Sequence, residues 1–279
     1  MREALLAVLG SKKYGGIEPA AVERIFLEEV GRHKSLKEAS KRTKARLHQL
    51  SFAFMSPELL RLAHGHLERY LLGDEGALFE ALKLHASTSE RLFALDALWD
   101  TIAQSAGGIG KILDLACGLN PLYLGHRGHS AIGLDISLGQ VALVNEWATR
   151  CGWDIEAHGA DLSQGMTLPT CDVALMMKLL PVLEQQRKGA GMALLSRVQA
   201  RRKLVTFPTR TLGGRTVGME AQYTRWFEEN LPPTEQILDR FVVANELCYV
   251  TMGRGDDARI VSDSGDAPAA HGTEAECNG

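Results

Sequence analysis

The sequence lacks any long apolar run. No stretch of its 279 residues approaches the roughly 18 apolar residues that a helix needs to span a bilayer, so we expect no membrane partner. The short apolar segment at residues 4–9 follows the acid Glu3. It precedes Ser-Lys-Lys at 11–13, where a signal peptide would carry small residues before its cleavage site. We therefore predict an N-terminal helix and a cytoplasmic protein.

Paired cysteines and phosphate-binding loops are also missing. The 5 cysteines are scattered and none belongs to a C-x-x-C pair, so neither a disulfide framework nor a zinc site is indicated, and we predict no metal. No G-K-[ST] sequence occurs, which excludes a Walker A loop, and the glycine turn after residue 116 is not G-x-G-x-x-G. A nicotinamide, flavin or nucleoside triphosphate site is therefore poorly supported.

The two signs of charge are unevenly distributed along the chain. Residues 1–50 carry 11 Lys+Arg against 6 Asp+Glu, whereas the remainder carries 20 against 28. The net charge of −3 alone argues against a nucleic-acid partner. However, a basic N-terminal segment on an acidic body is typical of an RNA- or DNA-binding arm.

The lysines of this segment gather on one face of a predicted helix at residues 35–54. At about 100° per residue, the cationic stripe contains Lys34, Lys37, Lys41, Lys44 and His48, and the opposite side contains Leu36, Ala39, Thr43, Leu47 and Leu50. The alternative is an ordinary surface helix whose lysines are only solvated. Because only Glu38 opposes the stripe, we favour contact with a phosphate backbone, which lysines can follow without reading bases.

Short apolar strands alternate with helices after residue 111. Strands are predicted at 112–116, 131–136, 155–158, 173–177, 203–207, 238–244 and 246–252, and helices from Pro19 and at 57–72, 74–84, 138–151, 183–199 and 219–230. This alternation predicts an α/β fold with a mostly parallel sheet covered on both faces. Asn245 alone separates the last two strands, which indicates a hairpin and an antiparallel edge strand. Residues 253–279 have the composition of a disordered tail.

Three acids stand at the ends of three consecutive predicted strands. Asp114 precedes the turn at Gly118, Asp135 ends the second strand, and the third strand is followed by Asp161. Open α/β sheets bind nucleotide-like ligands at this edge, where Asp135 could accept ribose hydroxyls and Asp161 an exocyclic amine. Ordinary turn acids remain the alternative. Since no basic phosphate clamp lies beside the loop, the set fits a nucleoside carrying an amino acid, which is S-adenosylmethionine.

The segment 85–92 offers a second candidate contact. Ser87 and Glu90 fit a capping box at a helix start, and a capped helix alone would explain both. It does not explain His85 and Arg91 beside the same start. Unpaired N–H groups together with an arginine would suit a carboxylate or a phosphate.

Five blocks occur in order along the chain: 85–92 (HASTSERL), 114–121 (DLACGLNP), 178–184 (KLLPVLE), 207–220 (FPTRTLGGRTVGME) and 245–249 (NELCY). With 11–14 and 31–35, they resemble the aminoglycoside-resistance 16S rRNA methyltransferases, the Rmt/ArmA group, over residues 1–252. The resemblance implies a class I S-adenosylmethionine-dependent methyltransferase with a Rossmann-like, seven-stranded sheet at 107–252, and an N-terminal helical rRNA-docking domain at 1–106. It implies methylation at N-7 of one guanosine in the decoding site of the assembled 30S subunit, by a monomer, which blocks deoxystreptamine aminoglycosides.

The same resemblance assigns roles to individual residues. Cofactor contacts are implied for His85, Ser87, Thr88, Arg91, Asp114, Ala116, Gly118, Asp135, Ile136, Asp161, Leu162 and Lys178. Lys178 and Glu184 are implied to matter for catalysis, although Glu184 could equally be a helix-start acid. RNA contacts are implied for Lys12, Lys13, Lys34, Lys37, Lys41, Lys44, Arg210, Arg215, Met219 and Glu246, with Arg215 and Met219 bordering a flipped guanosine; Met219 could also be a core residue.

The absent motifs agree with chemistry at guanine N-7, which has a free lone pair and needs no general base. Enzymes that methylate exocyclic amines typically carry D/N-P-P-Y/F after the fourth strand, where this chain reads Lys-Leu-Leu-Pro at 178–181. Two alternatives stay open. A small-molecule methyltransferase would use the same cofactor site without a basic extension, and an RNA-binding assembly factor would have kept the fold but lost the chemistry.

Overall fold

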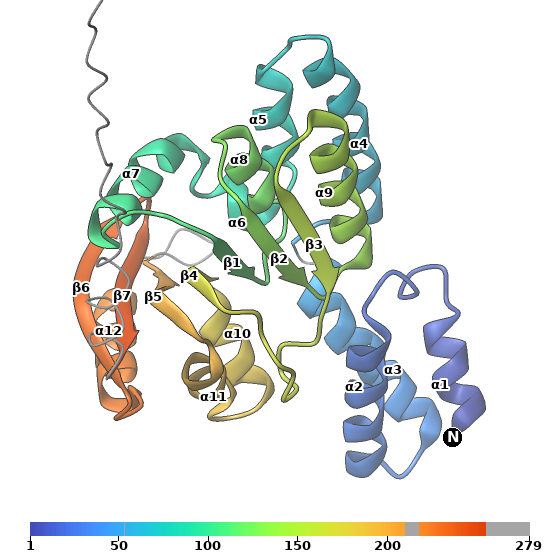
Figure 1. Ribbon diagram of the computed structural model, residues 1–279. Coiled ribbons are helices and arrows are strands. Elements are labelled where there is room, and N and C mark those ends of the chain that lie inside the picture. The colour runs from blue at the N-terminus through green and yellow to red at the C-terminus, as the bar shows by residue number, and fades with distance from the viewer. Residues whose placement is uncertain (53, 210–217, 255–279) are drawn as a thin grey trace, which may run out of the picture.

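A seven-stranded sheet forms the centre of the computed structural model, which describes residues 1–52, 54–209 and 218–254 (Figure 1). The strand order is β3-β2-β1-β4-β5-β7-β6. The strands are β1 (Ile112–Leu115), β2 (Ala131–Asp135), β3 (Ile155–Gly159), β4 (Cys171–Met177), β5 (Ala200–Pro208), β6 (Glu235–Val243) and β7 (Glu246–Gly253). All seven predicted strands are present, and the predicted α/β fold is confirmed.

The C-terminal hairpin closes one end of this sheet. β1 to β5 pair in parallel, whereas β7 is antiparallel to both β5 and β6. The predicted hairpin and its antiparallel pairing at the edge of the sheet are confirmed, and β7 lies between β5 and the edge strand β6. The turn holds two residues rather than one. Ala244 and Asn245 both have positive φ (53° and 61°), as a tight hairpin requires.

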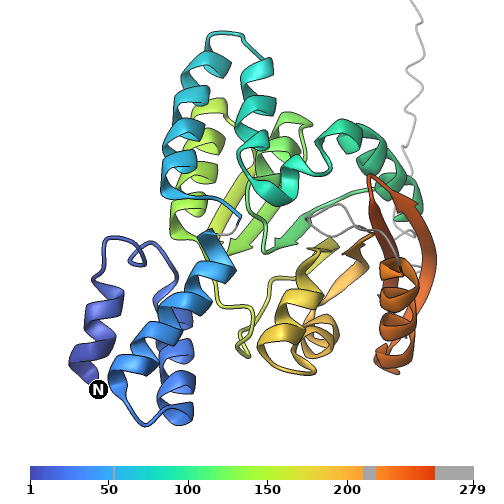
Figure 2. The same cartoon turned by 180° about the vertical axis from the view of Figure 1, so that it is seen from behind.

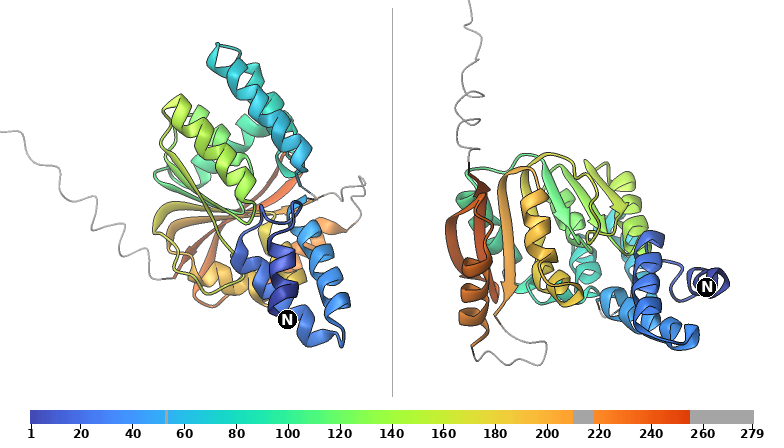
Figure 3. Two further views of the ribbon diagram at one scale, coloured as in Figure 1. Left: turned by 90° about the vertical axis from the view of Figure 1, so that its right-hand side faces the viewer. Right: turned by 90° about the horizontal axis from the view of Figure 1, so that it is seen from below.

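Helices cover both faces of the sheet (Figures 2 and 3). One core joins the sheet to α4 (Pro57–Leu71), α5 (Gly76–Lys83), α7 (Leu95–Ser105), α8 (Asn120–His126) and α9 (Leu138–Cys151). The other joins it to α10 (Leu179–Gln186), α11 (Ala190–Arg197) and α12 (Met219–Asn230). The predicted single helix at 183–199 is wrong, since the left-handed Gly189 (φ 83°) separates α10 from α11. α10 also begins earlier, because Pro181 is tolerated in its first turn.

The first three helices form a small unit of their own. α1 (Arg2–Leu9), α2 (Pro19–Arg32) and α3 (Leu36–Leu47) enclose a separate core around Val22, Ile25 and Leu47. We call this unit, together with the π-helical turn η1 (His48–Phe52) that ends the predicted helix at 35–54, the N-terminal module. It lies beside the tips of β2 and β3 (Figure 1). α4, α5 and α7, which also belong to the predicted N-terminal domain at 1–106, share the core of the sheet instead.

Two further expectations concern the ends of the chain and the membrane. Within the described residues, no helix is long and apolar enough to cross a membrane. Gly253 closes β7, and from residue 255 onward the predicted disordered tail lies outside the described residues.

Candidate cofactor pocket and adjoining groove

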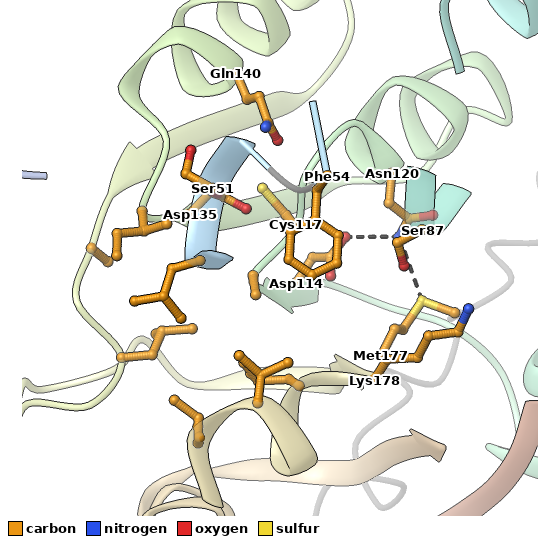
Figure 4. Close-up of a pocket in the computed structure, with 18 of the residues that line it drawn as sticks. Ser51, Phe54, Ser87, Asp114, Cys117, Asn120, Asp135, Gln140, Met177 and Lys178 are labelled. Carbon is orange, nitrogen blue, oxygen red and sulfur yellow. Dashed lines mark hydrogen bonds between the residues drawn. The ribbon is translucent and has the colours of Figure 1, made fainter. Parts of the chain in front are cut away.

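The carboxyl ends of β1, β2 and β3 meet at one pocket. Asp114, Asp135 and Asp161 all line it, as expected from their places at or just beyond the carboxyl ends of consecutive parallel strands. The empty space in and in front of the pocket is about 940 Å³, open solvent included. Leu50, Ser51 and Phe54, from or just after η1, form another part of the wall (Figure 4). Among the described residues, no cluster of side chains suited to a metal ion is present.

Asp135 is held by the backbone on both sides. Its Oδ2 accepts the N–H of Gly118 at 2.9 Å and its Oδ1 accepts the N–H of Ser137 at 2.8 Å. Burial raises the pKa of this carboxyl, while these N–H bonds oppose the rise. Each carboxylate oxygen keeps one acceptor position, which is the arrangement that two neighbouring hydroxyl groups of a ribose need.

Gly118 is the tightest point of the glycine turn. Its φ is +53°, and a Cβ built there would lie 2.5 Å from Cε1 of His85. The ring of His85 is buried, stacks on Phe54 and bonds Thr88 Oγ1 through Nδ1 at 3.0 Å. Burial, with the cations of Arg91 and Lys178 nearby, lowers the pKa of His85 to about 3, so the ring is neutral at pH 7. It is part of the pocket wall and cannot move aside freely.

Replacement of Gly118 by alanine is expected to destabilise the fold by about 2–4 kcal/mol, because overpacking against His85 adds to left-handed strain. Urea denaturation measures this. Gly152→Ala is the matched control, since Gly152 has φ +68° but nothing within 4 Å of the added methyl group. Equal losses in the two variants would show that the contact with His85 is unimportant.

Asp114 lies at the floor of the pocket and is fully buried. Its Oδ2 accepts a bond from Asn120 Nδ2 at 2.7 Å, and burial raises the pKa of Asp114 to about 7 (Figure 4). Within the described part of the chain, the side-chain oxygens of Asn120 and Gln140 are buried acceptors without a hydrogen-bond donor, and both residues line the pocket. A ligand rich in hydroxyl, amine and ammonium donors fits these orphaned acceptors.

The predicted capping box at Ser87 and Glu90 is wrong. His85, not Ser87, precedes the four-residue helix α6 (Ala86–Ser89), and no side chain caps it. Ser87 Oγ instead accepts from Nη2 of Arg91 at 2.8 Å, and Glu90 pairs with Nζ of Lys178. The structure does bring Ser87 and Arg91 together at the pocket wall, as predicted. Ser87 and Arg91 meet because the buried guanidinium of Arg91 donates to Ser87, and not because Ser87 caps a helix.

Lys178 lies between β4 and α10 in a left-handed conformation (φ 56°) that is strained for a residue with a side chain. Its Nζ lies 3.3 Å from Oε1 of Glu246, which is also 3.4 Å from Nε of Arg91. Glu246 further accepts the hydroxyl of Thr206 at 2.5 Å and is completely buried. This burial contradicts the predicted direct contact between Glu246 and RNA. Glu246 instead joins two cations of the pocket wall.

A second hollow adjoins the pocket. Its empty space is about 1770 Å³, open solvent included, and it shares Ser87, Phe54 and Lys178 with the pocket. One side is formed by Arg32 and Arg46 of the N-terminal module, and the other by Pro208, Met219 and Tyr223. We call it the groove. Lys178 therefore stands where a ligand in the pocket and a second molecule in the groove would meet.

A family model described as ribosomal RNA methyltransferase (FmrO) matches residues 10–250. The chain belongs to this family. Its sheet order and its pocket at the carboxyl edge are those of a class I methyltransferase, and S-adenosylmethionine is the methyl donor of such enzymes.

Named relatives of this rRNA methyltransferase cover nearly its whole length. A 16S rRNA (guanine(1405)-N(7))-methyltransferase from Serratia marcescens is 41% identical over 91% of this chain and 99% of that protein. One of the same description from Micromonospora echinospora is 33% identical over 88% and 93%. The crystal structure of the 16S rRNA methyltransferase RmtF in complex with S-adenosyl-L-homocysteine superposes with a TM-score of 0.85 at 45% identity, covering 90% of this chain and 97% of that one. The 16S rRNA methylase RmtB superposes at 0.80 and 38%, covering 90% and 98%.

The remaining predicted site residues of this family member are placed as follows. Ala116, Ile136 and Leu162 line the pocket. Glu184 does not line it, and its carboxylate accepts the N–H groups of Gly189 (2.7 Å) and Gly191 (2.9 Å), which supports a structural role at the start of α11. Lys12, Lys13, Lys34, Lys37 and Lys41 are exposed and Lys44 is half-buried, whereas Arg210 and Arg215 lie outside the described residues. On the apolar side of α3, Ala39, Thr43 and Leu47 are buried as predicted, but Leu36 is exposed.

Proposed function

We propose that this chain transfers the methyl group of S-adenosylmethionine to N-7 of guanine 1405 of 16S rRNA, as the names of its relatives describe for those proteins. The observation that carries the proposal is the acid-lined pocket that shares Lys178 with a groove flanked by Arg32 and Arg46. A methyl donor and a polyanionic acceptor each have a suitable surface, and the two surfaces meet at one residue.

Different residues of the pocket bind different parts of the methyl donor. We assign the ribose to Asp135, the adenine amine to Asp161, and the methionine carboxylate to Arg91 with Ser87. When bound, S-adenosylmethionine supplies a methyl group on a positively charged sulfur atom. Its ammonium group suits the floor at Asp114 and Asn120, where acceptors outnumber donors.

The chemistry at N-7 asks little of the protein beyond positioning. The lone pair of N-7 lies in the base plane, so no proton has to be removed before attack. A base stacked in a duplex must first be extruded, which costs a few kcal/mol. Phe54, Met219 and Tyr223 offer apolar surface in the groove for such a base, and Lys178 stands at its inner end.

We assign the initial docking of RNA to the exposed lysines of α3. The double variant Lys37→Glu/Lys41→Glu is expected to bind 30S subunits roughly 10- to 100-fold more weakly at physiological salt, because two phosphate contacts become repulsive. The slope of log affinity against log salt should flatten by about 2. Filter binding over a salt series measures both, and the affinity for S-adenosylhomocysteine should stay unchanged.

The control for this prediction is Lys83→Glu/Lys111→Glu, which makes the same change in net charge on α5 and at the amino end of β1, away from α3 (Figure 1). This variant should bind 30S subunits within about twofold of the wild type, as surface charge away from the contact contributes little. If both double variants bind equally, net charge rather than the α3 face determines docking.

One assay tests the proposed function. Purified protein is incubated with methyl-labelled S-adenosylmethionine and either assembled 30S subunits or naked 16S rRNA. The RNA is then cleaved at N-7-methylguanosine with borohydride and aniline, and the modified base is mapped by primer extension. We expect label at guanine 1405 in assembled subunits, by a monomeric cytoplasmic enzyme whose product blocks deoxystreptamine aminoglycosides. Label only in small molecules would favour a small-molecule methyltransferase, and binding without label an assembly factor.

A further inference from the structure

Arg24 of the N-terminal module reaches the wall of the cofactor pocket. From α2, its Nε donates to Oδ2 of Asp161 at 2.7 Å and its Nη2 to Oδ1 at 3.3 Å. Nη2 also donates to Oε1 of Gln186 at 3.2 Å, and Nη1 to Glu28 at 2.9 Å. The side chains of Arg24 and Asp161 are 13% and 3% exposed. A two-pronged, nearly dry contact of this kind fixes both the position and the direction of a carboxylate.

Asp161 keeps room for a ligand while Arg24 holds it. A carboxylate offers about four acceptor positions, of which Arg24 uses two and the N–H of Ser163 a third, at 3.1 Å. The free position belongs to Oδ2, because Ser163 bonds Oδ1. Without Arg24, this buried carboxylate would keep one backbone donor, and its charge would have no cation in contact among the described residues.

The N-terminal module also contacts the loop that follows Asp135. The N–H of Glu18 donates to the carbonyl of Ile136 at 2.8 Å, and the N–H of Leu138 donates to the carbonyl of Gly16 at 2.9 Å. This short bridge runs directly after Asp135. The module therefore contacts both loops that carry the outer acids of the pocket, one through backbone bonds and one through Arg24.

We propose that Arg24 is a positioning residue of the cofactor site: it holds the Asp161 carboxylate so that the free position on Oδ2 accepts the exocyclic amine of adenine. The N-terminal module is then part of the cofactor site and not solely an RNA-docking unit. The inference rests on the proposed function for the identity of the ligand and extends it to a residue that contacts no reacting atom.

Calorimetric titration with two ligands tests the inference. S-Adenosylhomocysteine carries the exocyclic amine, and S-inosylhomocysteine carries a carbonyl oxygen in its place. In Arg24→Ala, S-adenosylhomocysteine should bind roughly 10- to 100-fold more weakly, the loss typical of a charge-assisted hydrogen bond. The preference of the wild type for the adenosyl ligand should largely disappear. In turnover on 30S subunits, KM for the methyl donor should rise while kcat stays within about twofold.

Two further variants separate positioning from general stability. Arg24→Lys keeps the cation but not the two-pronged contact, so its affinity should lie between those of wild type and Arg24→Ala, and it serves as the test if Arg24→Ala does not fold. Arg150→Ala removes another arginine–carboxylate pair, between α9 and Glu68 of α4, that does not line the pocket, and it should bind both ligands as the wild type does. An unchanged adenosyl-to-inosyl preference in both Arg24 variants would overturn the inference. Failure of the wild type to bind S-adenosylhomocysteine would overturn the proposed function with it.

Discussion

Replacing Asp135 by asparagine is expected to weaken binding of S-adenosylhomocysteine by roughly 100-fold or more, as two charge-assisted bonds to ribose hydroxyls would be lost. The wild-type carboxylate accepts an N–H from Gly118 and another from Ser137. An asparagine amide group would turn a donor toward one of these two donors, so the loops could not close around it as before. Calorimetric titration measures the change.

The matched control is Asp172→Asn. Asp172 also accepts a backbone N–H, from Lys111 at 2.7 Å, but it lies at the amino edge of β4, opposite the pocket. Its substitution makes the same chemical change and should leave the affinity within about twofold, as expected for a substitution far from the ligand. The methylation rate of Asp135→Asn should recover only when the concentration of the methyl donor is raised by the same factor by which its affinity has fallen. If Asp135→Asn bound S-adenosylhomocysteine with wild-type affinity, Asp135 could not be the residue that binds the ribose.

The fold could be predicted because its signals are local. The inner parallel strands β1 and β4 are buried on both faces, so each appears in the sequence as a short apolar run, as β4 does with Val173 to Met177. Local sequence signals could not predict that β7, and not β6, pairs with β5. Hairpin strands are adjacent in sequence whichever of them faces β5, and the choice depends on which strand can be buried. β7 is buried along nearly its whole length, whereas β6 alternates between half-buried and exposed residues.

The acids of the pocket could be predicted because the topology forces them together. Asp114 and Asp135 lie near the carboxyl ends of β1 and β2, and Asp161 follows β3. Parallel neighbours end at the same edge of a sheet. Glu246 could not be placed in this way. Its position at the start of β7 does not tell whether it faces solvent or Lys178, and only packing decides that it is fully buried.

Contacts between distant segments were missed for a different reason. Arg24 and Asp161 are separated by 137 positions, and neither the spacing nor the amphipathic pattern of α2 indicates that they meet. The polar residue Asn120 stands directly after the glycine turn, which is a usable signal, since side chains there face the ligand. Gln140 gives no such signal, because it lies within an ordinary helix start.

Asp114 makes the stability of the ligand-free protein depend on pH. Burial raises its folded pKa to about 7, whereas an unfolded aspartate titrates near 3.9. A raised folded pKa stabilises the fold fully below the unfolded pKa, and this contribution is lost as pH rises through 7. Between pH 5 and pH 7 the wild type should therefore lose about 2 kcal/mol of unfolding free energy through this group.

Urea denaturation at pH 5, 6, 7 and 8 of the wild type and of Asp114→Asn isolates this contribution. The variant cannot ionise at this position, so its unfolding free energy should change less over the same range, and the two curves should converge toward low pH. Asp172→Asn, at the exposed amino edge of the sheet, should follow the wild-type curve. Parallel curves for wild type and Asp114→Asn would mean that Asn120 and its surroundings hold Asp114 ionised throughout. The pocket floor would then carry a fixed negative charge for the ligand's ammonium group, instead of one that appears near neutral pH.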